Sequence, residues 1–464
     1  MSTCIIKYGG KTQEKNLSIV RHSEIAKDFL KMHNKTIVVV SGAGDVTDRL
    51  EKAIIAGQKH NSLDENEFLN ITDPSNVFGV WENLYNSAGK PKELTELKNN
   101  IYKEFESVVR IILPRIKTYE EMHTIRAELN LFPEKLQAAL VNHTYKKSGL
   151  ESVCINFDNE NFPLAVKGNH LNGIVNLVET KEKCQKLLSN TNERVIVFPG
   201  YGGLDNKIEK TLGRGGSDTA AFAYGYGFNS EEIAILTDVE GIKQAIINGK
   251  ETRTIEEISL DEAGDGAFYG AKLPSHDSLE PLIEMHKENS DPLAYIAHHE
   301  KINGKKSKIV GVTRNKESVK FIGSRNNILV YRIGGNVVSL PKVLEEHGID
   351  NFYFGTRRLA NVVLNQKGRE IGEVIIDDYA KQGKINIEEK RDDLALVGII
   401  GEGMRTKPGI SGKMNSRLSE EGINIYLIFD VSPFSTGVAI LDKDKSKAVS
   451  CLYDEFLNHT IYLK

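Results

Sequence analysis

The glycine-rich run Thr211–Asp218, which reads TLGRGGSD, constrains the fold of this chain more than any other feature. The apolar strand pattern of Arg194–Gly200 precedes it, and the apolar helix pattern of Thr219–Ala223 follows it. A strand, a glycine loop and a helix start in this order offer backbone N–H groups and a positive helix end to an anion. Arg214 adds a planar guanidinium suited to a carboxylate or a phosphate. The run predicts an anion site in an α/β domain, and the alternative is a tight turn with a solvated arginine.

Length and composition narrow the class of protein. A chain of 464 residues exceeds one ordinary core, so we expect two or three domains. The net charge of −4 gives no electrostatic footprint for nucleic acid. No stretch is long and apolar enough to span a bilayer, and residues 1–7 lack a signal-peptide pattern. Four cysteines without CxxC spacing indicate reduced thiols. We therefore expect a cytoplasmic protein with neither nucleic acid nor membrane as partner.

Strand and helix signals alternate through the first 305 or so residues, which favours α/β layering. The segment from about 60 to 130 is predicted to be mostly helical, and a helix is predicted over Glu134–Lys147. Pro133 before it suits the first turn of that helix. The predicted strands are Cys4–Tyr8, Thr36–Ser41, Ser152–Asn156, Val195–Phe198 and Glu232–Thr237.

The C-terminal part repeats itself weakly. Val343–Asp350 returns further along as Arg417–Asn424, and in each copy a strand precedes the helix and another strand follows it. Leu394–Ile400 and Phe429–Ser435 are predicted strands of the second copy, with Pro433 at a strand edge or bulge. The repeat indicates one βαβ unit used twice, and the alternative is two unrelated α+β units with a similar helix end.

Two further glycine loops follow strands. Ile5–Thr12 breaks into the pair Gly9 and Gly10, and two adjacent glycines let backbone amides approach a phosphate closely. Lys7 at the strand end is placed to stabilise charge on a phosphoryl group during its transfer. Val40–Asp48 is a second candidate anion cradle, and the alternative is an ordinary strand–helix turn.

These loops, together with Thr237–Gly241, resemble those of the aspartokinase branch of the amino-acid kinase family. The resemblance implies an α/β amino-acid kinase fold, with a central mostly parallel sheet sandwiched by helices, in residues 1–305. It implies two βαββαβ ACT-like domains at residues 320–385 and 390–464. It also implies an amino-acid effector at the ACT domains and a homodimer or higher homo-oligomer.

The reaction implied by this resemblance is ATP-dependent phosphorylation of the side-chain carboxylate of L-aspartate to 4-phospho-L-aspartate. That reaction is the first step toward the aspartate-derived amino acids lysine, threonine and methionine. Mg²⁺ would accompany ATP and be held mainly by its phosphates. No metal site built by the protein itself is expected, and His298 and His299 are interpreted as surface or edge residues.

Site residues follow from the same resemblance. The catalytic residues are Lys7, on the transferring phosphoryl group, and Asp218, which orients Lys7 or Ser217. The expected contacts to the amino-acid substrate are Thr47, Glu134, Arg214 and Ser217. The expected contacts to the nucleotide are Gly9, Gly10, Ser41, Thr237, Asp238, Lys243 and Lys272. For Glu134 the alternative is a helix-capping carboxylate without a ligand.

The nucleotide side departs from the family pattern. Ile242–Asn248 lacks the tyrosine, the Asp-Pro turn and the arginine found in the family, so Lys243 is the remaining candidate for positive charge. Lys272 is retained within Gly270–Lys272, but Leu273–Asp277 differs from the residues that support it in the family. Two alternatives stay open on this ground. One is an amino-acid kinase with another small carboxylate acceptor, and the other is a non-catalytic, effector-binding regulatory subunit.

Overall fold

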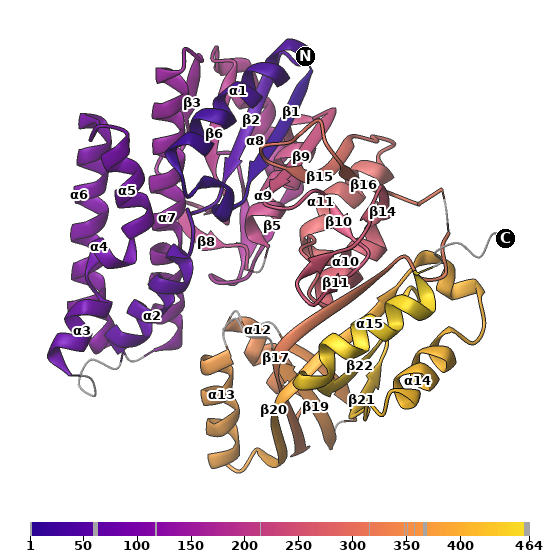
Figure 1. Ribbon diagram of the computed structural model, residues 1–464. Coiled ribbons are helices and arrows are strands. Elements are labelled where there is room, and N and C mark those ends of the chain that lie inside the picture. The colour runs from indigo at the N-terminus through magenta and orange to yellow at the C-terminus, as the bar shows by residue number, and fades with distance from the viewer. Residues whose placement is uncertain are drawn as a thin grey trace. The chain divides into compact units, whose positions relative to one another are not determined.

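Figure 1 shows the computed structural model, which describes residues 2–58, 64–116, 118–213, 215–314, 316–347, 349, 351–356, 358–364 and 369–458. The chain forms two compact units. The first comprises Met1–Glu240 and Glu280–Lys306, and the second comprises Gly241–Leu279 and Ser307–Lys464. The segment 241–279 therefore belongs with the C-terminal part of the chain. Among the described helices, none combines the length and the apolar character needed to cross a membrane.

A parallel sheet forms the centre of the first unit. Its strands are β1 (Thr3–Tyr8), β2 (Lys35–Val40), β3 (Ser152–Cys154), β6 (Val195–Pro199), β9 (Glu232–Thr237) and β15 (Leu293–His298). They lie in the order β15-β9-β1-β2-β6-β3, each parallel to its neighbour. Every residue of β2 is buried, as expected of a strand with both faces covered.

Helices cover this sheet. The helices of the first unit are α1 (Asn16–Met32), α2 (Val46–Gln58), α3 (Glu65–Ile71), α4 (Pro74–Val77), α5 (Gly79–Ser87), α6 (Lys92–Ser107), α7 (Tyr119–Lys147), α8 (Leu177–Asn190), α9 (Gly216–Phe228) and α11 (His276–Lys287), whose first residues belong to the second unit. Among the described residues, helices α3 to α6 pack on α2, α7 and one another, and not on the sheet. Helix α7 packs against β2, β3 and β6, whereas α9 contacts β1, β2 and β9. Cys4, Ile6 and Tyr8 of β1 share a core cluster with α1 and α7. Alternation along the strand turns Ile5 and Lys7 the other way.

Short antiparallel hairpins complete the first unit. They are β4 (Val166–Gly168) with β5 (Gly173–Val175), and β7 (Gly202–Asp205) with β8 (Ile208–Thr211). The second hairpin leads directly into the glycine-rich run and α9. The strand next to that run is therefore β8, and not the buried strand β6 that the sequence pattern indicated.

A single antiparallel sheet dominates the second unit, in the order β18-β19-β17-β20-β22-β21 (Figure 1). Its elements are β17 (Phe321–Gly335), α12 (Leu340–Glu346), β18 (Asn351–Gly355), β19 (Leu359–Leu364), α13 (Arg369–Lys381), β20 (Ile385–Ile400), α14 (Ile410–Glu420), β21 (Leu427–Phe429), β22 (Ser435–Leu441) and α15 (Lys445–Phe456). The chain thus repeats β-α-β-β-α, and β17 pairs with β20 from Phe321 opposite Ile400 to Gly335 opposite Ile385. Each copy has its own apolar core.

The segment that precedes this sheet contains smaller elements. They are β10 (Ile242–Lys243), β11 (Ile246–Ile247), β12 (Lys250–Glu251), β13 (Thr254–Ile255), β14 (Glu257–Ser259), α10 (Leu260–Phe268) and β16 (Lys306–Val310). Strands β14 and β16 are parallel, and β10 pairs with β13. Helix α10 begins with a capping box, in which Ser259 and Glu262 satisfy each other's backbone N–H groups.

The predicted strands of the first unit are confirmed to within two residues. Two local predictions are wrong. Pro133 lies inside α7 instead of at a helix start, because that helix begins after the N-cap Thr118 and packs along its length on the sheet and on neighbouring helices. Phe429–Ser435 is mainly the turn between β21 and β22, so Pro433 lies in a turn.

Candidate active site

Lys7 and Asp218 meet at the carboxyl end of β1. Lys7 Nζ lies 2.6 Å from Asp218 Oδ1, and the two side chains are 12% and 19% exposed. Asp218 belongs to the first turn of α9, where a carboxylate is favoured by the positive helix end. Partial burial strengthens the attraction between the two charges. The remaining exposure leaves both side chains accessible to a substrate.

The start of α9 depends on glycine. Gly213 and Gly215 have φ values of 67° and 71°, in the left-handed region that other residues rarely adopt. Ser217 follows in the first turn and is 8% exposed. An added Cβ on Gly200, at the end of β6, would lie 3.0 Å from Ser217 Oγ, so the serine packs directly against that strand end. Arg214 lies outside the described residues.

The two N-terminal glycine loops contact each other through their backbones. The Gly44 N–H donates to the Gly10 carbonyl at 3.2 Å. A Cβ on Gly10 would lie 2.4 Å from the Gly42 carbonyl oxygen, which excludes any side chain there. The Gly9 N–H donates to the Leu236 carbonyl at 3.2 Å, which ties the diglycine turn to the end of β9. The two loops predicted to bind anions are therefore in backbone contact with each other and with the end of β9.

Gln13 joins these loops, and sequence reasoning missed it. Its fully buried amide donates to the Tyr8 and Ser41 carbonyls, both at 3.1 Å. Its carbonyl oxygen accepts from Gln137 Nε2 of α7 at 3.2 Å. No local sequence signal marks this role, because the partners of Gln13 lie 5, 28 and 124 positions away.

Glu134 lies beside the second loop. It is 4% exposed, and the preceding residue Pro133 packs so closely on Gly42 that an added Cβ there would lie 2.7 Å from the Pro133 Cβ. Thr47 is half-buried in the first turn of α2, directly after the same loop. The neighbouring Lys135 is held by Glu209, with 2.6 Å between Nζ and Oε1. The fold thus brings Glu134 and the Gly42 loop together.

Thr237 and Asp238 follow β9, the strand adjacent to β1. Thr237 Oγ1 donates to Asp238 Oδ1 at 3.1 Å, and the Thr237 carbonyl accepts the His299 N–H at 2.9 Å. His299 Nδ1 lies 3.2 Å from Nε2 of the buried His22, whose ring stacks on Tyr8. Burial, followed by the neighbouring His299, holds the pKa of His22 well below its usual range.

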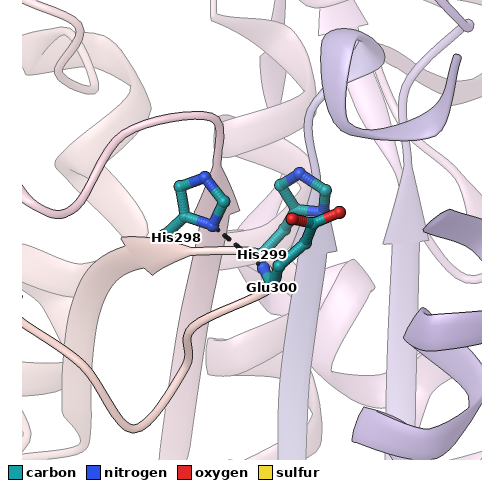
Figure 2. Close-up of side chains that lie close together, drawn as sticks. All are labelled: His298, His299 and Glu300. Carbon is teal, nitrogen blue, oxygen red and sulfur yellow. Dashed lines mark hydrogen bonds between the residues drawn. The ribbon is translucent and has the colours of Figure 1, made fainter.

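His298, His299 and Glu300 form a cluster with metal-ligating atoms within 4.8 Å of one another (Figure 2). The third member, Glu300, was not recognised in the sequence. His298 Nδ1 accepts the Glu300 N–H at 3.1 Å, and His299 Nδ1 is engaged by His22. One nitrogen of each ring is therefore already used by the protein. The prediction of surface or edge residues is wrong for His299, which is buried at 8% exposed.

Two of the expected nucleotide residues belong to the second unit. Lys243 Nζ lies 2.9 Å from Thr254 Oγ1 and 3.2 Å from Glu251 Oε2. Lys272 is exposed in the turn that follows α10. The first unit holds the remaining described site residues.

Comparisons with known proteins agree with this geometry. A model of the amino acid kinase family matches residues 2–287, and an ACT domain model matches residues 397–456. An aspartate kinase of Pseudomonas putida is 29% identical over 301 residues, which are 59% of this chain and 69% of that protein. An aspartokinase of Bacillus sp. is 23% identical over 398 residues, 80% of this chain and 95% of the relative.

Solved structures show the same fold over the whole chain. E. coli aspartokinase III in complex with aspartate and ADP has a TM-score of 0.76 at 18% identity, covering 98% of this chain and 99% of that one. Clostridium acetobutylicum aspartate kinase has a TM-score of 0.64 at 18% identity, with 98% and 100% covered. The aspartokinase resemblance drawn from the motifs is thereby confirmed. Since the family model spans more than half of its residues, this chain belongs to the amino acid kinase family.

Proposed function

We propose that this protein transfers the γ-phosphoryl group of ATP to the side-chain carboxylate of L-aspartate, forming 4-phospho-L-aspartate. The observation that carries the proposal is the Lys7–Asp218 ion pair beside two glycine loops in backbone contact, with Glu134 buried next to the second loop. The curated relatives named aspartate kinase favour aspartate over other acceptors.

The phosphate end of ATP fits the first unit. Gly10 and Gly42 let the two loops pack closely on each other and on Pro133, and glycine-rich loops of this kind suit phosphate oxygens because their backbone can be approached closely. Ser41 lies in the second of these loops, and Thr237 and Asp238 would contact the nucleoside side. Mg²⁺ would be held mainly by the phosphates, because hydrated Mg²⁺ needs few protein ligands.

Phosphoryl transfer to a carboxylate needs no general base, since the acceptor is already ionised at neutral pH. The protein's tasks are positioning and charge stabilisation. Lys7 would neutralise charge on the transferring group, and Asp218 would hold the Lys7 ammonium in place. Glu134 would bind the substrate ammonium, while Arg214, by family resemblance, would bind its α-carboxylate. Thr47 and Ser217 would also contact the amino-acid substrate. Lys243 and Lys272 would contact the nucleotide.

Regulation by a small amino acid is part of the proposal. A cavity of about 230 Å³ in the second ACT copy is lined by Met404, Gly409, Gly412, Asp430, Ser432 and Thr436. Its size suits an amino acid, and the positive end of α14 (Ile410–Glu420) suits a carboxylate. We further propose a homodimer or higher homo-oligomer, in keeping with the ACT resemblance.

Hydroxylamine trapping tests the function directly. The protein is incubated with ATP, Mg²⁺ and L-aspartate, and the acyl phosphate is captured as a hydroxamate. We expect signal with L-aspartate and none with L-glutamate. Signal with a different carboxylate would contradict the acceptor, and absence of signal with every acceptor would contradict the enzymatic function.

A further inference from the structure

Helix α10 is fixed to the second ACT copy along one face. Glu262, Asp265 and Tyr269 follow one another at helical spacing, and each is fully buried. The Tyr269 ring packs on the central strands of the ACT sheet, where a Cβ added to Gly437 would lie 2.3 Å from it. Tyr269 OH also donates to the Phe429 carbonyl at 3.5 Å. A helix within the kinase-family match is therefore docked on the regulatory sheet.

The first turn of α10 is held by Glu262. Its Oε2 accepts Lys320 Nζ at 2.6 Å, and its Oε1 accepts the Glu402 N–H at 2.7 Å. Both Lys320 and Glu402 flank the ends of the long ACT strands β17 and β20. A buried, doubly paired carboxylate is costly to disturb, so α10 has one defined position on the ACT sheet.

Asp265 uses its two carboxylate oxygens to contact two different segments of the chain. Oδ2 accepts the Ser432 hydroxyl at 2.5 Å, and Ser432 lies in the turn between β21 and β22. Oδ1 lies 2.9 Å from Nε2 of His276, the first residue of α11. Gly270–His276, which contains Lys272, is thus bounded by α10 at one end and by the His276–Asp265 contact at the other.

We propose that Asp265 is a positioning residue for nucleotide binding: it fixes the turn that carries Lys272 and makes that turn depend on the Ser432 hydroxyl of the second ACT copy. The inference rests on the proposed function, because the role of Lys272 at the ATP phosphates comes from family resemblance. It adds a route by which one ACT side chain sets nucleotide affinity.

The test is calorimetric binding of MgADP to the full chain, with KM and kcat measured alongside. We expect Ser432→Ala to weaken MgADP binding about threefold and Asp265→Asn about tenfold, as loss of hydrogen bonds to a charged group predicts. KM for ATP rises in step, while KM for L-aspartate stays within about twofold. Both variants disrupt the same hydrogen bond, between Ser432 and Asp265. The double variant should therefore bind MgADP no more weakly than Asp265→Asn.

A conservative variant and two control variants test whether the effect is specific to the contacts of Asp265. His276→Gln keeps a donor for Asp265 and should bind nearly as wild type, whereas His276→Leu should resemble Asp265→Asn. Ser416→Ala and Asp392→Asn change exposed residues of the same unit and should leave nucleotide binding unchanged. A merely structural role would lower the melting temperature without separating the KM for ATP from the KM for L-aspartate.

Unchanged MgADP affinity in Ser432→Ala and Asp265→Asn would overturn the inference, as would failure of the wild type to bind MgADP. If Asp265→Asn does not fold, Ser432→Ala, which removes one hydroxyl, decides alone. Failure of the proposed function is seen separately, as wild-type MgADP binding without a hydroxamate signal. The binding comparison remains valid in that case.

Discussion

The phosphate-side residues and the nucleotide-side lysines are supported in different ways. Around Lys7, the support comes from backbone contacts between glycine loops and from the buried amide of Gln13. Around Lys272, it comes from α10, whose buried carboxylates are paired with residues of the ACT part of the chain. The family motif is well kept in the first region and altered in the second. Where the motif is kept, support comes from within the first unit, and where it is altered, support comes from the regulatory sheet.

The largest effect is expected for Lys7→Ala, which removes the cation that Asp218 orients. We expect kcat to fall about 10³-fold with the fold retained, as for loss of one group that stabilises a transition-state charge. Lys11→Ala, four positions away and exposed, is the matched control and should keep most activity. Equal losses in both variants would remove the distinction between Lys7 and its neighbour.

Glu134→Gln should raise KM for L-aspartate about 100-fold, because a buried carboxylate that binds an ammonium group is neutralised. MgADP affinity should not change. Glu120→Gln alters an exposed carboxylate on the same helix and serves as control. Weakened MgADP binding in Glu134→Gln would show that the two sides of the site are not separable as described.

Gln13→Ala tests how much the buried Gln13 amide stabilises the glycine loops around Lys7. Removing the amide leaves buried carbonyls short of a donor, at a cost of about 3 kcal/mol. For a unit of this size, that corresponds to roughly 5–10 °C in the melting transition. Calorimetry of the full chain should show the shift in one transition, with Gln382→Ala, an exposed residue in the turn after α13, as control. A shift of both transitions together would mean that the two units unfold as one.

The smallest effects concern pH, and they have opposite signs in the two regions. The pKa of buried His22 is lowered, so its contribution to stability is present above about pH 6.5 and is lost as pH falls through the folded-state value. The pKa of His276 is raised by its hydrogen bond to Asp265, so its contribution is present below about pH 6.5 and is lost as pH rises through the folded value.

Melting curves recorded between pH 5 and pH 8 check these signs. His22→Gln should reduce the fall in melting temperature toward pH 5. His276→Gln should reduce the smaller fall in melting temperature toward pH 8. His276 is 44% exposed, so solvent screening limits its share. Identical pH profiles for wild type and both variants would contradict both assignments.

The sequence allowed more of the fold than of the site to be predicted. Buried strands such as β2 and β9 were located closely because continuous β-branched runs have few other uses. The prediction of a helix start at Pro133 failed because proline is common at helix starts. The helix continues through Pro133 because of tertiary packing, which a local sequence pattern does not reveal. Gln13 and Asp265 were missed because each has a hydrogen-bond partner more than a hundred positions away, Gln137 and Ser432. Lys7 and Asp218 were found because family motifs encode that long-range pairing.

The pairing of β17 with β20 has a consequence for work with fragments. Both ACT copies contribute to one sheet, and these two strands form its middle. A fragment that ends before residue 385 would leave β17 as an open edge, with a row of unpaired backbone groups available to other chains. Such a fragment should therefore self-associate, and a soluble regulatory module will need both copies intact.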